Sequence, residues 1–438
     1  MKNCASLLYP LVVPSANDLL PVNKNAPDRD ATIFEPIHCF LNSCLQKYIH
    51  ERRFAPISQT SSERLTIHDF KTQQKERQKM PKVRLAGTVT GEKDPNRQTR
   101  AKLLYRLFSK GWDIYNSNGD QRISLKNIEK KIIEADAFVF TPGATLEDLF
   151  KAVSIFVGYQ TLDRNLENKP TVLLNSDESW TGLYDLLSHL NTMGTVKQDA
   201  RNFLLEAEDV EDVLTLLEKA RAAGVPDAGR ERTGEVAGPS FDTPLPAAHR
   251  GNVCVFCSAS IEEPGYLSDG YELGRLLAAS DYGCVSGAGN SGIMGEVVRG
   301  SVDAGGWTGG SNVPHIIELE GLPEGLSTFW LKPDIYTRME IMIENSQAFV
   351  IFPGGAGTLQ EMLALMIFKQ QKMKGMVDKP VIVFNRKDSE DRRFWTPLIK
   401  LLGDWCYDGE FIVVEELSEI VPLVEKMVGS KPAVIETL

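Results

Sequence analysis

From residue 251 onward, hydrophobic positions alternate between two patterns. Short runs in which nearly every residue is apolar predict buried strands, and longer runs with apolar residues three and four apart predict amphipathic helices. Strands that alternate with helices in this way are typical of an α/β domain with a mostly parallel sheet. The predicted strands are 252–259, 282–287, 347–354 and 379–385, and the predicted helices are 266–280, 291–305 and 358–371.

The same pattern occurs earlier in the chain. Residues 135–150 align with residues 346–363, and residues 168–175 align with residues 378–385 at nearly the same distance downstream. The segments SWTGL and FWTPL match as well. Repetition on this scale predicts a duplicated domain, because the periods of solenoid repeats are far shorter. The expected fold is therefore α/β, with two Rossmann-like parallel-sheet domains that arose by internal duplication.

The first copy is the shorter one. Its apolar strands near Val83 and Phe138 are about 55 residues apart, whereas the equivalent strands of the second copy are almost 100 residues apart. The missing part corresponds to the glycine loop after the second strand and to the helix that this loop opens. The shortening therefore removes residues that would carry chemistry.

Composition marks the boundaries between these parts. Residues 224–250 are rich in Gly, Pro and charge and have no apolar period, which predicts a linker. The first 80 residues also lack a sustained period. The expected organisation is a poorly ordered extension at 1–80, a degenerate α/β domain at 81–223, a linker at 224–250, a complete α/β domain at 251–429 and a tail at 430–438.

Charge and composition exclude several classes of protein. The chain has 438 residues, of which 42% are hydrophobic and 24% charged, and its net charge is −11. It therefore lacks the basic footprint of a general nucleic-acid binder. The chain has no run of about 18 apolar residues, so no membrane-spanning helix is predicted. Pro10 and Pro14 interrupt the apolar N-terminal stretch that a signal peptide would need. Seven cysteines are few for this length and favour reduced thiols in the cytoplasm.

The strongest local motif is PGGAGTLQE at 353–361, between a very apolar strand and a helix. A glycine loop at this place lets backbone N–H groups point at an anion, which the helix dipole also favours. Thr358 is predicted near the helix N-cap, where its hydroxyl caps the helix or binds a phosphate oxygen, and Glu361 falls at the capping-box position. A structural cap and a ligand loop both fit the motif, and its three glycines favour the ligand loop.

A second glycine loop, GAGNSG at 287–292, matches the pattern GxGxxG. It follows the second strand of its domain, and no clear acidic residue closes the next strand about 20 residues later, as a dinucleotide fingerprint requires. A phosphate or sugar site is therefore favoured over NAD, with a structural turn as the alternative. Cys254 and Cys257 lack a second cysteine pair, which favours core thiols over zinc. No metal and no cofactor are expected.

Arg338 lies 23 residues before Glu361. A guanidinium suits bidentate binding of phosphate or pairing with a carboxylate. Together with PGGAGTLQE, this arginine resembles the pattern of the Lonely Guy (LOG) family of nucleoside 5′-monophosphate phosphoribohydrolases, which are often mislabelled lysine decarboxylases. VCVFCSAS at 253–260 and GAGNSGIMG at 287–295 are similar to the first strand and the glycine loop of that family, so the resemblance covers about 180 residues of the second copy.

The resemblance implies a reaction: hydrolysis of the N-glycosidic bond to a free base and ribose 5-phosphate, without a cofactor. Arg338 and Glu361 are the implied catalytic residues. A carboxylate near the anomeric carbon stabilises the oxocarbenium-like ribose and activates water, and Arg338 would hold the glutamate or a substrate oxygen. The implied substrate- and phosphate-binding residues are Ser258, Gly287, Gly289, Gly292, Met294, Gly295, Pro353, Gly354, Gly355, Ala356, Gly357 and Thr358.

The chain also departs from the family pattern. Met339 replaces a lysine and Ala288 a glycine, so cytokinin specificity does not follow from the resemblance. In the first copy the loop at 142–148 is two residues shorter, Asp148 stands at the place of the glutamate, and no counterpart of Arg338 is evident. That copy is predicted to be catalytically dead.

The family forms homodimers with active sites near the subunit interface. The expected assembly is therefore a homodimer, or a pseudo-dimer in which the first copy docks on the second within one chain. The alternative function is a nucleotide-binding or cofactor-carrier protein without turnover. A further alternative is a regulated enzyme in which the catalytically dead first copy binds an effector.

Overall fold

The computed structural model describes residues 81–86, 94–116, 134–161, 163, 166, 169–223, 249–373, 375–403 and 405–429. These residues all belong to one compact unit that begins at Gln74. The predicted extension at 1–80, almost all of the predicted linker and the predicted tail at 430–438 lie outside them. Within this part of the chain, no helix has both the length and the apolar character needed to cross a membrane.

The residues before the linker, here called the N-terminal half, form a five-stranded parallel sheet in the order β2-β1-β3-β4-β5. Its strands are β1 (Lys82–Ala86), β2 (Asp113–Asn116), β3 (Ala137–Phe140), β4 (Thr171–Leu174) and β5 (Leu204–Ala207). Its helices are α3 (Arg97–Ser109), α5 (Leu146–Gln160), α6 (Thr181–Thr192) and α7 (Val210–Ala223), with a short 3₁₀ turn at Ala200–Asn202.

The residues after the linker, the C-terminal half, form a seven-stranded parallel sheet in the order β12-β11-β10-β6-β7-β8-β9. Its strands are β6 (Gly251–Phe256), β7 (Tyr282–Ser286), β8 (Thr308–Asn312), β9 (Thr328–Leu331), β10 (Ala348–Ile351), β11 (Val381–Phe384) and β12 (Ile412–Val414). Its helices are α8 (Pro264–Ala279), α9 (Gly292–Asp303), α10 (Pro314–Glu320), α11 (Ile335–Glu344), α12 (Ala356–Gln370), α13 (Thr396–Gly403) and α14 (Ile420–Val428), with a 3₁₀ turn at Leu417–Glu419.

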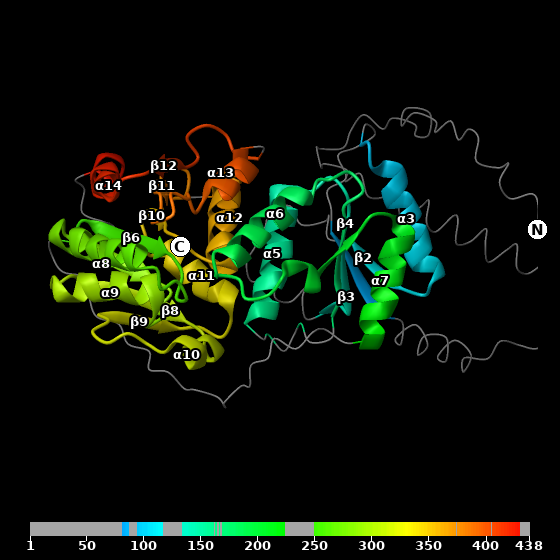
Figure 1. Cartoon of the computed structure of the whole chain (residues 1–438), viewed down its shortest axis with the longest axis horizontal. Coiled ribbons are helices and arrows are strands. Elements are labelled where there is room, and N and C mark those ends of the chain that lie inside the picture. The colour runs from blue at the N-terminus through cyan, green and yellow to red at the C-terminus, as the bar shows by residue number, and fades with distance from the viewer. Residues whose placement is uncertain are drawn as a thin grey trace, which may run out of the picture. The chain divides into compact units, whose positions relative to one another are not determined.

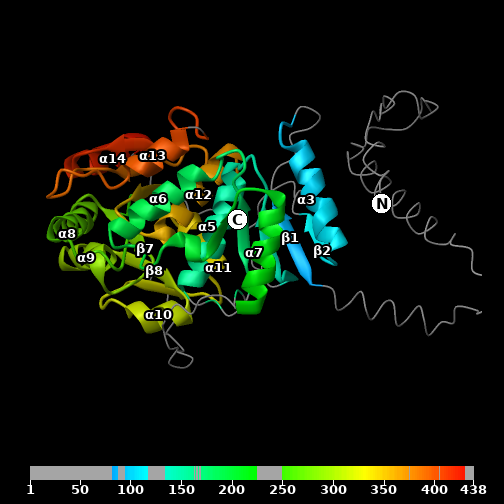
Figure 2. The same cartoon turned by 45° about the vertical axis from the view of Figure 1, so that its right-hand side comes forward.

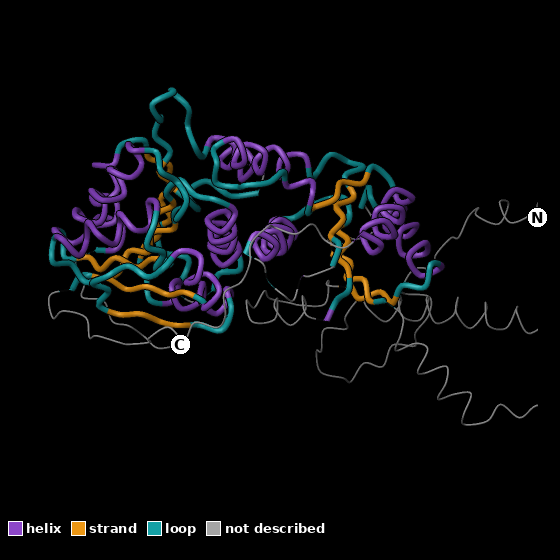
Figure 3. The backbone as a smooth tube through the Cα atoms, turned by 60° about the horizontal axis from the view of Figure 1, so that its bottom comes forward, coloured by secondary structure: helices purple, strands orange, loops and turns teal. Residues whose placement is uncertain are grey.

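Figure 3 shows the strands of each half flanked by helices. The α/β prediction is therefore confirmed, and every predicted strand and helix of the C-terminal half is present. The two sheets share one order, because β2-β1-β3-β4-β5 corresponds to β7-β6-β10-β11-β12. The larger sheet continues with β8 and β9, which have no counterpart in the N-terminal sheet as described. Most of the shortened stretch, residues 117–133, lies outside the described residues, so the missing helix stays a prediction.

The helices α5 and α12 are buried on almost every side. Twelve of the fifteen residues of α5 are buried, as are twelve of the fifteen of α12. A helix that is apolar all round must be covered on both faces. The two helices contact each other, and Figures 1 and 2 show α5 and α12 side by side. Their buried residues also belong to one apolar cluster with residues of the strands. One continuous apolar core consequently includes residues of both halves.

The order of the larger sheet reverses between β10 and β6. From β6 the chain moves outward through β7, β8 and β9, and it then returns to β10 on the other side of β6. In open parallel sheets ligands bind beyond the carboxyl ends of the strands at such a reversal. The loops that follow β6, β7 and β10 are therefore the place to examine for a site.

Candidate functional site

The three loops at the reversal are hydrogen-bonded to one another. The backbone N–H of Ser258, after β6, donates to the carbonyl of Pro353, after β10, at 3.0 Å. The N–H of Met294, at the start of α9, donates to the carbonyl of Ser258 at 3.1 Å. The Ser291 hydroxyl donates to the carbonyl of Ala259 at 2.7 Å. The structure thus brings together the three motifs that the sequence singled out.

The helix α12 begins two residues earlier than the sequence predicted. Its first residue is Ala356 and its N-cap is Gly355, which has no capping side chain. Thr358 therefore lies near the N-cap, as predicted, but does not cap the helix, so the structural cap, one of the two interpretations of the motif, is not formed here. In the described structure the N–H groups of Gly354, Gly355, Ala356 and Gly357 have no protein partner. Free amides at the positive end of a helix are a ready anion site.

Thr358 lies inside the first turn of α12 and is buried. Its side chain folds back over Gly354 so closely that a Cβ on Gly354 would overlap the Thr358 hydroxyl. Gly357 lies on the open side of the turn, because a Cβ there would meet no atom within 4 Å. The Thr358 hydroxyl therefore lies beside Gly354, at the same end of α12 as the free amides.

Arg338 projects from α11 and is 8% exposed. Its Nε donates to the carbonyl of Ser311 at 2.8 Å, and one terminal nitrogen donates to the carbonyl of Gly287 at 3.1 Å. A guanidinium has five N–H donors, so three remain for other partners. The described hydrogen bonds of Arg338 thus go to these carbonyls and not to Glu361. Both predicted roles of the arginine, holding the glutamate and holding a substrate oxygen, stay predictions.

Glu361 is 9% exposed and its carboxyl has no hydrogen-bond partner in the described part of the chain. Burial raises its pKa from 4.5 to about 8, because the charged form is poorly solvated; the positive charge of Arg338 opposes this shift and the negative charge of Glu320 adds to it. The Cys254 and Cys257 thiols lie near it, and burial and the Glu361 charge raise the pKa of both. A buried group with a strongly shifted pKa, beside a glycine loop, marks a functional-site candidate.

The remaining predicted residues lie in the loop after β7 and at the start of α9. Gly287 and Gly289 are in the loop after β7, where a Cβ on Gly287 would overlap the Arg338 guanidinium and the Gly289 N–H donates to the Met294 sulfur at 3.0 Å. Gly292 and Gly295 are in the first turn of α9. Every predicted site residue therefore lies at the same edge of the sheet, while the role of each stays a prediction.

Ala288 stands in this loop where the family has a glycine. Its φ is +55°, in the left-handed region that costs a residue with a Cβ about 1–2 kcal/mol. Its methyl group lies against Gly310 of β8, where a second Cβ would approach within 2.6 Å. The backbone of the loop is therefore strained at the position where the chain departs from the family.

Glu320 is a site residue that the sequence did not reveal. It is the last residue of α10, its backbone carbonyl accepts from the N–H of Asn290 at 3.2 Å, and its carboxylate would lie 2.5 Å from a Cβ on Gly289. A GxGxxG loop is commonly followed by an acidic residue about 20 positions later. Glu320 follows that loop at a greater distance and ends a helix, so the spacing of the fingerprint does not identify it.

Replacement of Glu320 by glutamine is expected to lower the pKa of Glu361 below about 8. The negative charge of Glu320 raises that pKa, so its removal makes ionisation of Glu361 easier. The pH dependence of the carboxyl infrared band, assigned with Glu361→Gln, measures the shift. Glu318→Gln on the same helix is the matched control and should leave the pKa unchanged. An unchanged pKa of Glu361 in Glu320→Gln would contradict an electrostatic interaction between the two carboxyl groups.

The equivalent loop of the N-terminal half is built differently. Thr145 is the N-cap of α5, and Asp148 closes a capping box with it. The structural cap that the sequence offered as one interpretation of the C-terminal motif is thus found in the other half. Asp148, which aligns with Glu361, serves the helix start.

The N–H groups of this loop are already occupied. Those of Gly143 and Ala144 donate to the Ser179 hydroxyl at 3.1 and 3.2 Å, and that of Gly143 also donates to the Asp177 carboxylate at 2.7 Å. Arg100 of α3 donates to the carbonyl of Pro142 at 2.6 Å and forms a buried ion pair with Asp94. A carboxylate of the protein itself therefore takes the place that an anionic ligand would need.

The fold and these loops define a class: parallel α/β proteins with glycine loops and a buried Arg and Glu at the reversal of the sheet. A family model described as "Possible lysine decarboxylase" matches residues 108–217 and 294–430, which is more than half of the chain. The chain belongs to this family, the LOG family. The matched residues fall in both halves, as an internal duplication predicts.

Curated relatives match about two fifths of the chain. A probable cytokinin riboside 5′-monophosphate phosphoribohydrolase of Arabidopsis thaliana is 32% identical over 190 residues, 42% of this chain and 84% of the relative. The enzyme of that name from Rhodococcoides fascians is 28% identical over 177 residues, 39% of this chain and 82% of the relative. Among solved structures, the molybdenum cofactor binding protein of Rippkaea orientalis is 19% identical, with 42% of this chain and 100% of that chain covered and a TM-score of 0.34. A TM-score this low has no bearing on function.

Proposed function

We propose that the chain hydrolyses the N-glycosidic bond of a nucleoside 5′-monophosphate and releases a free base and ribose 5-phosphate. One observation carries the proposal: the buried carboxyl of Glu361 lies on the same helix as the free amides at Gly355–Gly357. Those amides suit a phosphate monoester. The relatives named as phosphoribohydrolases support the same reaction.

The spacing along α12 suits this substrate. Glu361 lies four positions after Gly357, which is about 6 Å along a helix axis. A ribose 5-phosphate spans a similar distance between its phosphorus and its anomeric carbon. A phosphate bound at Gly357 would therefore bring the anomeric carbon close to the Glu361 carboxyl.

The reaction then needs only protein groups and water. The C1′–N bond breaks, its electrons go to the base, and the ribose passes through an oxocarbenium-like state. The ionised carboxylate of Glu361 stabilises that positive charge and takes a proton from the water that attacks C1′. The released base takes up a proton. Arg338 holds a substrate oxygen with its remaining N–H groups, and its charge favours the ionised form of Glu361.

Free base released from AMP, GMP, CMP, UMP, IMP and N6-isopentenyl-AMP, measured by chromatography, tests the proposal. At least one monophosphate should be cleaved, with kcat/KM about 100-fold above that of its nucleoside, because the remote phosphate orients the reacting bond. Equal rates with nucleosides would contradict the phosphate loop. Monophosphates that raise the melting temperature without any base release would instead identify a nucleotide- or cofactor-binding protein without turnover.

A further inference from the structure

Equivalent helices of the two halves pack on each other. The helix α5 contacts α12, and each of them follows the glycine loop of its half. The helix α6 contacts α13, and each of them begins in the repeated SWTGL or FWTPL segment. When the same surface of two copies meets itself, the interface has the form of a two-fold dimer. The two halves therefore meet as the subunits of such a dimer would, within one chain (Figure 2).

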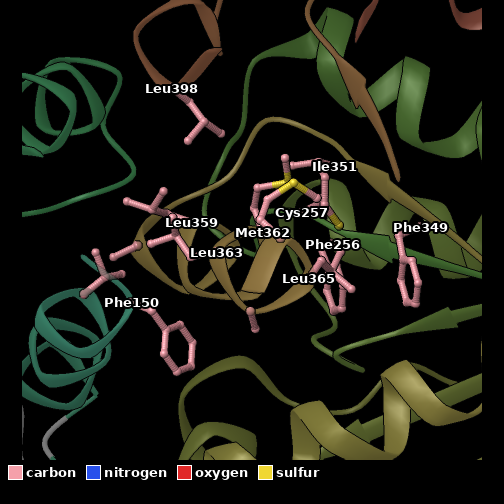
Figure 4. Packing of buried hydrophobic residues seen from close by; sticks show 14 of the residues in the cluster. Phe150, Phe256, Cys257, Phe349, Ile351, Leu359, Met362, Leu363, Leu365 and Leu398 are labelled. Carbon is pink, nitrogen blue, oxygen red and sulfur yellow. The ribbon is translucent and has the colours of Figure 1, made fainter. Parts of the chain in front are cut away.

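This interface reaches the residue beside the catalytic candidate. Phe150 of α5 lies on the side that faces Leu359 and Leu363 of α12 (Figure 4), and all three side chains are fully buried. The Gln360 amide donates to the Ser154 hydroxyl at 3.0 Å, and both residues are also buried. Gln360 directly precedes Glu361, so contacts from the N-terminal half hold the turn of α12 that carries the carboxyl.

A loop of the N-terminal half also lies against residues 354–357, here called the anion loop because their amides are free in the described structure. The carbonyl oxygen of Thr195, after α6, would lie 3.0 Å from a Cβ on Gly355, and the Thr195 Cβ would lie 3.6 Å from it. Thr195 is held firmly, because its N–H and its hydroxyl both donate to the carbonyl of Leu190 at 3.0 Å. The Asn191 amide donates to the carbonyl of Val196 at 2.7 Å. The segment Gly194–Val196, which these hydrogen bonds hold in place, thus lies directly beside Gly355, the N-cap of α12.

We propose that the N-terminal half acts as a built-in, catalytically silent partner subunit whose Gly194–Val196 loop forms one wall of the anion site at Gly355–Gly357. The ligand is a phosphate monoester, which is the part of the inference that rests on the proposed function. The equivalent loop of the N-terminal half, at 142–145 in the described structure, offers no such site, because Asp177 and Ser179 already bond its amides. Each chain therefore has one complete site, and both halves contribute to it.

Two substitutions of opposite charge at Thr195, made in the full chain, test whether the Gly194–Val196 loop borders the anion site. Thr195→Glu should raise the Kd for ribose 5-phosphate about tenfold or more by calorimetry, because like charges repel at short range, whereas Thr195→Lys should keep or lower it. Thr192→Glu, at an exposed position on the last turn of α6, is the matched control and should match the wild type. Equal Kd values for the Glu and Lys variants would overturn the proposal.

The same titrations count the sites. One ribose 5-phosphate per chain is expected, and two per chain would overturn the claim that the N-terminal half is silent. Binding does not require turnover, so a chain that binds ribose 5-phosphate with the expected charge dependence but cleaves no nucleotide would refute the hydrolase and leave this inference standing. A wild type that does not bind ribose 5-phosphate at all would refute the wall.

The mass of the protein in solution tests the built-in partner. Light scattering should give the mass of one chain, because α5 and α6 already cover the surface of α12 and α13 that a second copy would use. A stable two-chain species would contradict a partner supplied only within the chain.

Discussion

Replacement of Glu361 by glutamine is expected to lower the rate of base release by about 10³-fold, the usual contribution of a positioned acid–base group. The amide keeps the size of the carboxyl, so the fold and nucleotide binding should persist. It cannot ionise, so it neither stabilises the oxocarbenium-like ribose nor accepts a proton from water. Initial rates by chromatography and Kd by calorimetry separate the two effects.

The same substitution should stabilise the fold in alkaline solution. The pKa of Glu361 is raised from 4.5 to about 8 by folding, so the folded chain binds more protons than the unfolded chain between these values. Stability therefore falls as pH rises through this range. Glu361→Gln removes the loss, and its melting temperature should exceed that of the wild type at pH 8 and match it near pH 4.5.

Asp148→Asn provides the matched control. Asp148 aligns with Glu361 but closes the capping box of α5, so its replacement should cost about 1 kcal/mol of stability and leave base release unchanged. If Asp148→Asn abolished activity, or if Glu361→Gln kept more than a tenth of it, the assignment of the reaction to the C-terminal half would be wrong.

Replacement of Arg338 by lysine is expected to lower kcat/KM by about 10²-fold, the effect of losing a preorganised donor. Lysine keeps the charge but not the planar fork, and only the fork donates to the Ser311 and Gly287 carbonyls while it presents further N–H groups. The loss should therefore appear with every nucleotide that is cleaved. Steady-state kinetics with the best substrate of the panel measures it.

Arg338→Met goes one step further, because it also removes the charge. The positive charge of Arg338 lowers the pKa of Glu361, so its loss should raise that pKa above about 8. Because the ionised carboxylate is the reactive form, kcat/KM should rise with pH through this pKa, and the midpoint of the rise should move to higher pH in Arg338→Met. Arg275→Lys, on the exposed side of α8, is the control for an Arg-to-Lys change and should match the wild type. An unchanged pH midpoint in Arg338→Met would show that the two side chains do not interact.

Glu361 and Asp148 show that aligned residues of a duplicated motif can take different structural positions. The sequence aligns them, and a Thr followed three residues later by an acid occurs in both halves, a pattern compatible with a capping box. In the N-terminal half the helix begins after Thr145, so the box forms. In the C-terminal half the helix begins two residues before Thr358, so Glu361 lies in the second turn and faces the interior.

Much of the fold could be predicted from local pattern. Buried strands and amphipathic helices differ in the period of their apolar residues, and this period is a property of neighbouring residues. The strands, the helices and the parallel sheets could be predicted for this reason. The repeat and the positions of PGGAGTLQE and Arg338 follow from the identity of the residues themselves.

Contacts between distant segments were decided by the tertiary structure alone. Glu320 reaches the loop at Gly289 because β8 and α10 fold back beside it, and Asp177 reaches the amide of Gly143 because the loop after β4 lies beside the loop after β3. The raised pKa of Glu361 is the result of desolvation by every segment around it. Neither short-range periodicity nor residue type encodes such effects, since they depend on the side chains that meet.

The sequence by itself thus determined the fold class, the duplication and the chemical groups available, because local propensity, apolar period and motif chemistry are carried by residues close together in the chain. Only the tertiary structure decided which copy keeps free amides, which carboxyl is buried and which half faces the anion loop. Those outcomes depend on burial and on contacts between residues far apart in sequence, and burial is created when the two halves pack.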